Sequence, residues 1–397
     1  MRQVLAIDIG TSQAKVLAGK AVDGKVEILA SAVAPMQGYY KGKFEQIPAV
    51  VAAVRQAVEC VTTAVAGPFE CTYVGIGAAI LQSDNLEGSV APMQPQNVSE
   101  SDVERACRAS VAALSSEQAV LHIIPVEYSL DKQVYKEFPQ GKACHSLRVK
   151  THVISMPKAL KSQLNAELAR QSIPVSGFVA NSYAALLGLK EEIKQQDALI
   201  FDLGAGTADV SLLRQGQLVL STSLPYGGDY ITSDLSQAFS VTLEQAEGIK
   251  KYYAKLDKGL YRQNIMLDCD DSMGLKEKIA YDFLHDIIES RTEELVYLMR
   301  EDIKNYLPQE ADVWAKAAVY MTGGCAQLSS FIEQIEKQFT LKPEVIIAHR
   351  MPQEYQALSS SAVYGVLCYA VDNLSPEYKV PSTWQFVVNK VKNMFGS

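Results

Sequence analysis

The chain has 397 residues, of which 48% are hydrophobic and 21% are charged. This composition is typical of a globular protein with several domains, and it excludes a disordered chain or one small module. Lys and Arg number 37 against 45 Asp and Glu, which gives a formal charge of -8. An acidic chain has no general attraction to phosphate backbones, so we expect no nucleic-acid partner.

Cysteine usage and the first residues favour the cytoplasm. The seven cysteines are an odd number and form no C-x-x-C pair, as in proteins of a reducing compartment. The opening run MRQVLAIDIG meets Asp8 too early for a secretory signal. No apolar run reaches the roughly 18 residues needed to cross a bilayer. We therefore expect a protein that neither leaves the cell nor spans a membrane.

A strand-turn-strand pattern occurs near the start of the chain and again near its middle. An apolar strand ends at Asp8 and is followed by the turn Gly10-Thr11-Ser12 and a second strand. The second copy has a strand that ends at Asp202, the turn from Gly204 to Thr207 and another strand. The repetition predicts an α/β fold with two duplicated lobes.

Each turn is a candidate phosphate site. Successive backbone N–H groups in a Gly-rich turn bind phosphate oxygens, and the neighbouring carboxylate suits a hydrated Mg²⁺. One copy alone is more often an ordinary hairpin, because short motifs have many false matches. Two copies favour a cleft that holds a polyphosphate from both sides, with Asp8 and Asp202 near the metal.

Other nucleotide motifs are absent from the sequence. A Walker A loop requires Ser or Thr after Gly-Lys, but Gly42-Lys43 is followed by Phe44. A dinucleotide fingerprint requires a third glycine and a helix after Gly204 and Gly206, whereas this chain has Asp209 and a strand-like run. Neither a P-loop nor a Rossmann fold is expected.

Residues 84–156 predict an inserted lobe. Ser99 is placed to cap a helix with Asp102 in its first turn, and strand-like runs begin at His122 and Ser146. Farther along, residues 243–256 and 274–306 have the composition and period of helices. Residues 319–339 predict a strand, a glycine turn and an amphipathic helix.

Two glycine pairs and one acid-lysine pair near the second copy each have two possible interpretations. Gly227-Gly228 and Gly323-Gly324 are either plain turns or places where a ligand approaches the backbone, the second pair opening a helix. Glu247 and Lys250 share a helix face and form either a ribose-binding pair or a solvated ion pair.

The order of these elements resembles the actin-like ATPase superfamily. Within it the chain is most similar to the FtsA family of bacterial cell-division proteins. The segments that carry this resemblance are YGGDYITSDLSQAF from Tyr226, AEGIK from Ala246, HIIPVEYSLD from His122 and LRVKTHVI from Leu147. The two segments in the inserted lobe are the most specific, because FtsA has a distinctive lobe there. The resemblance covers nearly the whole chain.

The resemblance implies a set of sites and lobes. The nucleotide, ATP with Mg²⁺, is expected against residues Asp8, Gly10, Thr11, Ser12, Lys15, Asp202, Gly204, Ala205, Gly206, Thr207, Gly227, Gly228, Glu247, Lys250, Gly323 and Gly324. The expected lobes are residues 1–83 with 157–196 (first actin-like), 84–156 (inserted), 197–242 with 311–371 (second actin-like) and 243–310 (helical, binding nucleotide and FtsZ), then a linker, 372–381, and a helix, 382–397.

Two details bear on partners and chemistry. Arg291 resembles the arginine of the FtsA helix that receives the C-terminal tail of FtsZ, although an exposed arginine beside Glu294 is an equally good interpretation. Hydrolysing relatives often place Glu or Gln where this chain has Asn181, and the second turn carries Ala205 and Ala208 in place of glycine and threonine. ATP binding is therefore expected, with slow hydrolysis at most.

The C-terminal segment predicts a membrane-binding helix. On a helical wheel its apolar side chains and its lysines separate into two faces, as in an interfacial helix. A helix docked on its own domain is the alternative. The residues expected to bind the membrane are Trp384, Val387, Val388, Lys390, Val391, Lys392, Met394 and Phe395.

Together these features predict a cell-division protein that polymerises on the cytoplasmic face of the membrane at the septum and anchors the FtsZ ring. Expected partners are FtsZ, other copies of the chain, inner-leaflet lipids and later division proteins through the inserted lobe. A pilus-assembly scaffold resembling PilM and a small-molecule kinase of the same superfamily are the alternatives.

Overall fold

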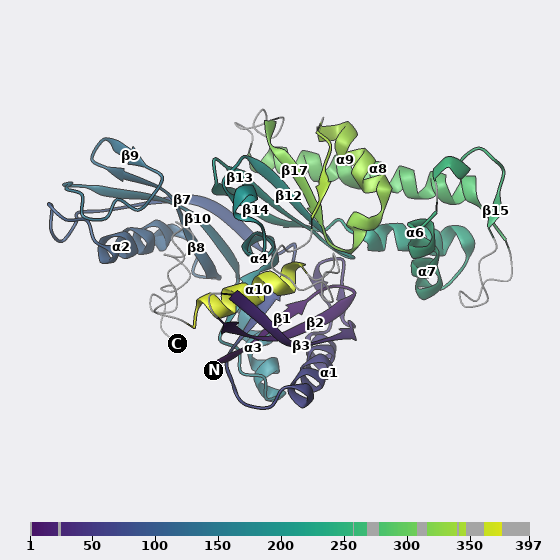
Figure 1. Cartoon of the computed structure of the whole chain (residues 1–397), viewed down its shortest axis with the longest axis horizontal. Helices are drawn as coiled ribbons and strands as arrows, with labels where there is room; N and C mark the ends of the chain where they lie inside the picture. The colour runs from purple at the N-terminus through teal and green to yellow at the C-terminus, as the bar shows by residue number, and fades with distance from the viewer. Residues whose placement is uncertain are drawn as a thin grey trace.

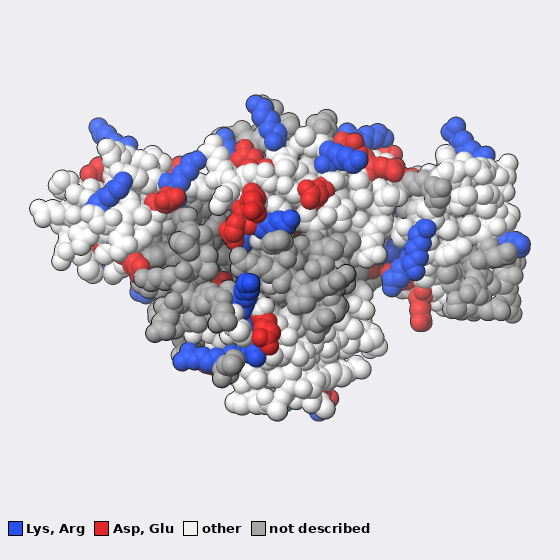
Figure 2. Space-filling model, viewed as in Figure 1, with Lys and Arg blue, Asp and Glu red and all other residues white. Residues whose placement is uncertain are grey.

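A computed structural model describes residues 2–22, 25–256, 258–267, 278–307, 316–339, 341–346 and 361–374 of the chain. Its described part consists of two sheet-based lobes, an inserted lobe at one end of the long axis and a helical lobe at the other (Figure 1). Basic and acidic side chains are interspersed over the face shown in Figure 2.

The two central sheets repeat one topology. The first has the order β11 (Gly177–Ala180), β6 (Phe69–Ile76), β1 (Gln3–Ile9), β2 (Gln13–Val22), β3 (Lys25–Pro35). The second has the order β18 (Glu344–Val345), β17 (Ala318–Thr322), β12 (Ala198–Leu203), β13 (Ala208–Arg214), β14 (Gln217–Leu224). In each, three consecutive antiparallel strands are joined by parallel strands on the side of the first strand. The predicted duplication is therefore confirmed.

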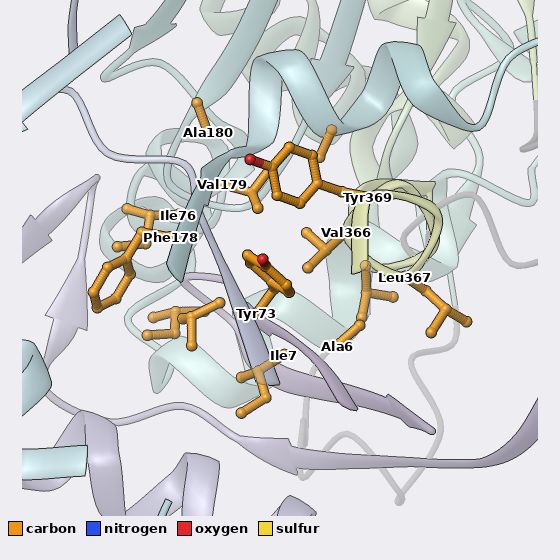
Figure 3. Packing of buried hydrophobic residues seen from close by; sticks show 14 of the residues in the cluster. Ala6, Ile7, Tyr73, Ile76, Phe178, Val179, Ala180, Val366, Leu367 and Tyr369 are labelled. Atoms are coloured by element: carbon orange, nitrogen blue, oxygen red, sulfur yellow. The ribbon is translucent and has the colours of Figure 1, made fainter. Parts of the chain in front are cut away.

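The helices of the first lobe are α1 (Ile47–Ala64), α3 (Lys158–Arg170), α4 (Asn181–Leu187), α5 (Glu191–Lys194) and α10 (Ser361–Asp372). Of these, α1, α4 and α10 pack on its sheet, and α3 packs on α1. The sequence places residues 311–371 in the second lobe, but α10 packs on β1, β2 and β6 of the first sheet. Figure 3 shows Val366, Leu367 and Tyr369 of this helix on the side of the sheet that carries Ala6 and Tyr73. The expected lobe assignment is wrong for α10. This helix is apolar on all sides, so it is stable only when it is buried from two directions, and the first sheet and α4 bury it.

Helix α1 is an exception to the expectation of no membrane-length apolar segment. Its 18 residues have a mean hydropathy of 1.2, enough by length and composition to cross a membrane. Its buried side, which includes Val50, Val54 and Val61, joins the core of the first lobe. The helix therefore has a packing role in the described fold.

The inserted lobe has a separate sheet and core. Its strands have the order β7 (Gln82–Val90), β10 (Leu147–Pro157), β8 (Gln118–Leu130), β9 (Gln133–Tyr135), and α2 (Glu100–Ser110) packs on β7 and β10. Ser99 and Asp102 form the predicted cap, each side chain bonding the other's backbone N–H. The cap and both strands predicted here are confirmed.

The second sheet carries the helices α6 (Gly228–Phe239), α7 (Leu243–Tyr253), α8 (Tyr281–Tyr306) and α9 (Ser329–Phe339). Helix α8 begins later than predicted, because Ile279–Ala280 forms strand β16 and pairs with β15 (Met266–Leu267). Gly324–Gln327 forms a 3₁₀ turn, so Gly323-Gly324 does not open α9 directly.

Candidate functional site

The turns of the two equivalent hairpins have the same backbone geometry. The Gly10 N–H donates to Gln13 O at 3.2 Å, and the Gly204 N–H donates to Thr207 O at 2.8 Å. The strand registers pair Asp8 with Lys15 and Asp202 with Asp209. The copies therefore differ in charge at one equivalent position, where the first has a cation and the second an acid.

Both turns line one pocket, which encloses about 520 Å³. The predicted residues that line it are Asp8, Gly10, Thr11, Ser12, Lys15, Asp202, Gly204, Ala205, Thr207, Glu247, Lys250, Gly323 and Gly324. They come from both central sheets, from α7 and from the turn after β17. The structure thus brings together segments that are far apart in the sequence.

The other predicted glycines lie behind the pocket wall. A Cβ on Gly206 would be 2.6 Å from the Thr11 side chain, and one on Gly227 would be 2.3 Å from Ala205 O. A Cβ on Gly228 would be 2.5 Å from Cys325 Sγ. These three glycines allow neighbouring segments to approach closely. For Gly227-Gly228 this favours the structural interpretation over contact between the backbone and a ligand.

Sequence reasoning missed several lining residues: Gln13, Lys251, Ala254, Lys255, Cys325, Gln327, Leu328 and Ala362. A signal for Lys251 in α7 and for Ala254 and Lys255 just after it was present, since all three share the face of Glu247 by helical period. No sequence pattern indicated Ala362, because α10 lies next to the pocket only in the folded chain, far in sequence from the other lining residues.

Asp8 is 2% exposed and has two partners. Lys15 Nζ lies 3.2 Å from Asp8 Oδ2, and Asn181 Nδ2 donates to Asp8 Oδ1 at 2.9 Å. Asn181 lines the pocket, but its Oδ1 is buried and has no hydrogen-bond partner within the described part of the chain. Asn181 therefore fixes the orientation of Asp8 and has an unused acceptor.

Burial raises the pKa of Asp202 from 3.8 to about 6, with a further rise caused by Asp8 and an opposing effect of Lys15. Burial and the charge of Asp202 raise the pKa of Asp209 well above its usual value, although Ser223 donates a hydrogen bond to its carboxylate. Asp8, Asp202 and Asp209 thus line the same part of the pocket as Lys15. Bound cations favour the ionised forms of such acids.

The donor set fits Mg²⁺ shared with phosphates. No group of three or more His, Cys, Asp or Glu able to hold a metal occurs among the described residues. Mg²⁺ usually takes one or two carboxylates together with water and substrate phosphates. Asp8 and Asp202 supply such carboxylates.

Glu247 and Lys250 form an ion pair whose lysine is buried. Lys250 Nζ lies 2.6 Å from Glu247 Oε2, and the Lys250 side chain is 7% exposed. Thr232 Oγ1 lies 2.7 Å from the same carboxylate oxygen. The ion pair considered for these residues is present, with its lysine buried and its carboxylate partly exposed, and both residues line the pocket.

A second concavity lies between α6 and α8. It is lined by Asp234, Gln237, Ala238, Phe283, Asp286, Ile287, Ser290, Arg291 and Glu294. Arg291 is 27% exposed and contacts Asp234 through Nε and Nη2, and Glu294 through Nη1. The ion pair between Arg291 and Glu294 is confirmed. The half-exposed Phe283 ring lines the same groove.

The predicted membrane helix, with Trp384, Val387, Val388, Lys390, Val391, Lys392, Met394 and Phe395, lies outside the described residues, as does most of the predicted linker.

Comparison with known families identifies the chain's relatives. Residues 199–365 match the family described as cell division protein FtsA, and residues 78–155 match the SHS2 domain inserted in FtsA. Together the two matches cover more than half of the chain. The chain belongs to the FtsA family.

Individual FtsA proteins match over most of their length. The chain is 25% identical to FtsA of Escherichia coli K12, over 85% of this chain and 82% of that protein. It is 24% identical to FtsA of Buchnera aphidicola from Acyrthosiphon pisum, over 99% and 97%. The inserted lobe is thus the SHS2 domain of FtsA.

Solved structures show the actin-like fold. The PilM-PilN type IV pilus biogenesis complex has a TM-score of 0.65 at 15% identity, over 93% of this chain and 98% of that one. MreB5 of Spiroplasma citri bound to ADP has a TM-score of 0.53 at 14% identity, over 92% and 95%. The predicted fold class is confirmed.

Proposed function

We propose that this chain binds ATP with Mg²⁺ in the cleft pocket and acts at the division site as a membrane-bound filament that anchors the FtsZ ring. Membership of the FtsA family supports the role in division. The observation that carries the proposal is the pocket itself, because two equivalent hairpin turns and the glycine turn after β17 line one cavity.

The proposed binding mode follows from the lining groups. The backbone N–H groups at Thr11, Ser12, Ala205 and Thr207 bind phosphate oxygens, and Lys15 offers a cation beside Asp8. Asp8 and Asp202 hold Mg²⁺ together with the phosphates. The metal, when bound, neutralises phosphate charge.

Solved structures of the same fold bind adenine nucleotides. The MreB5 structures of Spiroplasma citri hold ADP in one case and AMPPNP in the other. Their identity to this chain is 14% and 15%, so the likeness itself extends to the fold alone. We keep the expectation of slow hydrolysis at most, since Asn181 bonds Asp8 where relatives place a residue that orients water.

The groove between α6 and α8 is proposed to receive the FtsZ tail. Phe283 and Ile287 provide apolar contact, and Arg291 provides a cation for a carboxylate. Arg291 already contacts Asp234 and Glu294, so an acidic segment has to displace one of these carboxylates. An Arg291→Glu variant is expected to lose FtsZ-tail binding while keeping ATP binding.

Self-association and membrane contact are proposed together. MamK, a double helical filament in its solved structure, has the same fold with a TM-score of 0.51. A short amphipathic helix binds a membrane weakly in one copy and strongly in a filament, because linked copies bind at a high effective concentration.

Co-sedimentation with anionic vesicles tests membrane binding and its dependence on nucleotide. The full chain and a form ending at residue 381 are compared with and without Mg²⁺ and ATP. We expect only the full chain to sediment, and more of it with ATP. If a separate binding measurement shows that the full chain does not bind ATP with Mg²⁺, the proposed function is refuted.

A PilM-like scaffold is the second candidate, because the PilM-PilN complex matches the fold over nearly the whole chain. If the form ending at residue 381 binds vesicles as well as the full chain, the PilM-like role is favoured. A small-molecule kinase would instead show rapid phosphorylation of a sugar or acid in a coupled assay.

A further inference from the structure

His122 belongs to the inserted lobe by sequence, but its ring packs on the first lobe. It is a residue of β8 and is 2% exposed. The centre of its ring lies 4.8 Å from that of Tyr183 in α4 and 5.5 Å from that of Tyr369 in α10. Strand β8 also contacts β11, at the edge of the first sheet. The inserted lobe therefore places a buried polar side chain against the other lobe.

This side chain bonds the residue at which α4 begins. The Ala180 N–H donates to His122 Nε2 at 3.1 Å, so the proton of the neutral imidazole is on Nδ1. Burial lowers the pKa of His122 to about 3, with a further effect of His152, so the ring stays neutral and keeps its acceptor near neutral pH. The Ala180 N–H therefore keeps this partner under ordinary conditions.

The start of α4 depends on this bond. Ala180 is the N-cap residue of α4, and its side chain makes no capping hydrogen bond. In a capping box, a Glu or Gln at the third helical position bonds the N–H of the N-cap residue. Tyr183 stands at that position in α4, and the histidine from β8 supplies the bond instead. The start of the helix is thus held from the inserted lobe.

Asn181, the next residue, connects the start of α4 with the pocket. Its Nδ2 donates to Asp8 Oδ1 at 2.9 Å, whereas the other Asp8 oxygen faces Lys15. Asn181 is 5% exposed and follows Ala180 directly, so a shift of the helix start moves its amide relative to Asp8. Two hydrogen bonds at consecutive residues therefore connect His122 with Asp8.

We propose that His122 is a positioning residue for the binding of Mg²⁺ with ATP: it fixes the start of α4, so that Asn181 holds the Asp8 carboxylate in the orientation that binds the metal. Since Asp8 has this role only if the chain binds ATP with Mg²⁺, the inference rests on the proposed function. His122 does not occur among the described residues that line the pocket, so it acts through Asn181. The inserted lobe thereby contributes to the metal side of the cleft.

The test measures the dissociation constant of ATP by calorimetry on the full chain, once with EDTA and once with Mg²⁺. The first value divided by the second is the magnesium ratio. His122→Leu removes the acceptor and is expected to lower this ratio about two- to tenfold, the effect of one ordinary hydrogen bond. His122→Gln offers an acceptor again and is expected to restore most of it. If the leucine variant does not fold, His122→Asn, whose side chain is too short to reach the Ala180 N–H, replaces it.

His152→Leu is the matched control. His152 is 1% exposed in the neighbouring strand β10, and its Nδ1 lies 2.9 Å from Asn85 Oδ1 in β7. The substitution removes a second buried histidine of the same sheet without touching the start of α4. A lower melting temperature with a wild-type magnesium ratio is the expected result, which separates positioning from a general loss of structure.

Asn181→Ala tests the route from His122 to Asp8. This variant is expected to lower the magnesium ratio, because removal of a group that orients a metal ligand commonly costs about 10–100-fold in metal affinity. His122→Leu added to it is expected to change the ratio no further. If the two effects multiply, if His122→Leu keeps the wild-type ratio, or if the wild-type ratio is near one, the inference is overturned while nucleotide binding stands. If the wild type binds no ATP in either condition, the proposed function itself fails.

Discussion

Lys41 Nζ lies 3.9 Å from the centre of the Tyr230 ring, and this contact connects the first lobe to the second. Lys41 is at the tip of the hairpin formed by β4 (Tyr39–Tyr40) and β5 (Lys43–Phe44), and Tyr230 is in α6. Lys41 and Gly42 have φ values of 45° and 74°, typical of a two-residue hairpin turn. A Cβ on Gly42 would lie 2.7 Å from Thr207 Cγ2, so the tip rests on the turn from Gly204 to Thr207.

The first prediction is that this contact slows nucleotide release. Tyr230→Leu removes a cation–π interaction worth about 0.5–2 kcal/mol. We expect it to raise the release rate of a fluorescent ATP analogue roughly two- to thirtyfold in stopped-flow experiments, because the lobes separate more easily. Tyr230→Phe keeps the ring and serves as the control. Equal release rates for Tyr230→Leu and wild type would refute the role of the contact.

The second prediction concerns pH. The pKa of Asp202 is 3.8 when unfolded and about 6 in the fold, so the folded form binds more protons between these values. The stability that this group contributes is present below pH 4 and is lost as the pH rises through 6. Relative to Asp202→Asn, the ligand-free wild type is expected to lose roughly 3 kcal/mol of unfolding free energy across this range.

Urea unfolding at a series of pH values measures this difference. Glu45→Gln changes an exposed carboxylate and provides the matched control. A wild-type minus Asp202→Asn difference that is flat from pH 4 to 7 would contradict the prediction. Mg²⁺ and ATP are expected to reverse the effect, because a bound cation favours the ionised carboxylate and so releases a proton.

The sequence predicts the hairpins well because their determinants are local. A strand that ends in Asp and a glycine turn recur in both copies, and the order of strands follows from alternating patterns. Ser99 and Asp102 are likewise a local pair, three residues apart, and form the predicted cap. Family resemblance then groups these turns around one cleft.

The rest depends on contacts between distant segments. Asn181 bonds Asp8 across 173 positions, and no local pattern indicates that pairing. Lys250 looks like a ligand-binding cation by sequence, but Gly228 and Thr232 consume its donors in the fold. The position of α10 also depends on which lobe has an apolar surface free to bury it. The hydrophobicity of the helix alone does not specify that lobe.

The third prediction concerns packing between α10 and α4. A Cβ on Gly365 would lie 1.8 Å from Ala184 O, so Gly365→Ala forces the two helices apart. Overpacking of this kind costs about 1–3 kcal/mol or more. We expect a matching loss of unfolding free energy in urea, while the same substitution at an open site has little effect. A stable Gly365→Ala variant would show that this helix contact is wrong.

The fourth prediction addresses the C-terminal helix. Val388→Glu puts a charge on the predicted apolar face and is expected to abolish sedimentation with anionic vesicles. Asn389→Glu adds the same charge on the polar face, so it is expected to weaken binding only slightly. Equal loss in both variants would indicate that net charge, rather than an apolar face, determines the interaction.

The fifth prediction separates the site from the scaffold. A Cβ on Gly324 would meet no protein atom within 4 Å, although Gly324 lines the pocket. Gly324→Ala is therefore expected to change the unfolding free energy by less than about 0.5 kcal/mol. If ATP occupies that space, the added methyl group lowers its affinity roughly tenfold, since overpacking costs about 1–3 kcal/mol. Unchanged affinity at unchanged stability would mean that the nucleotide does not approach the turn after β17.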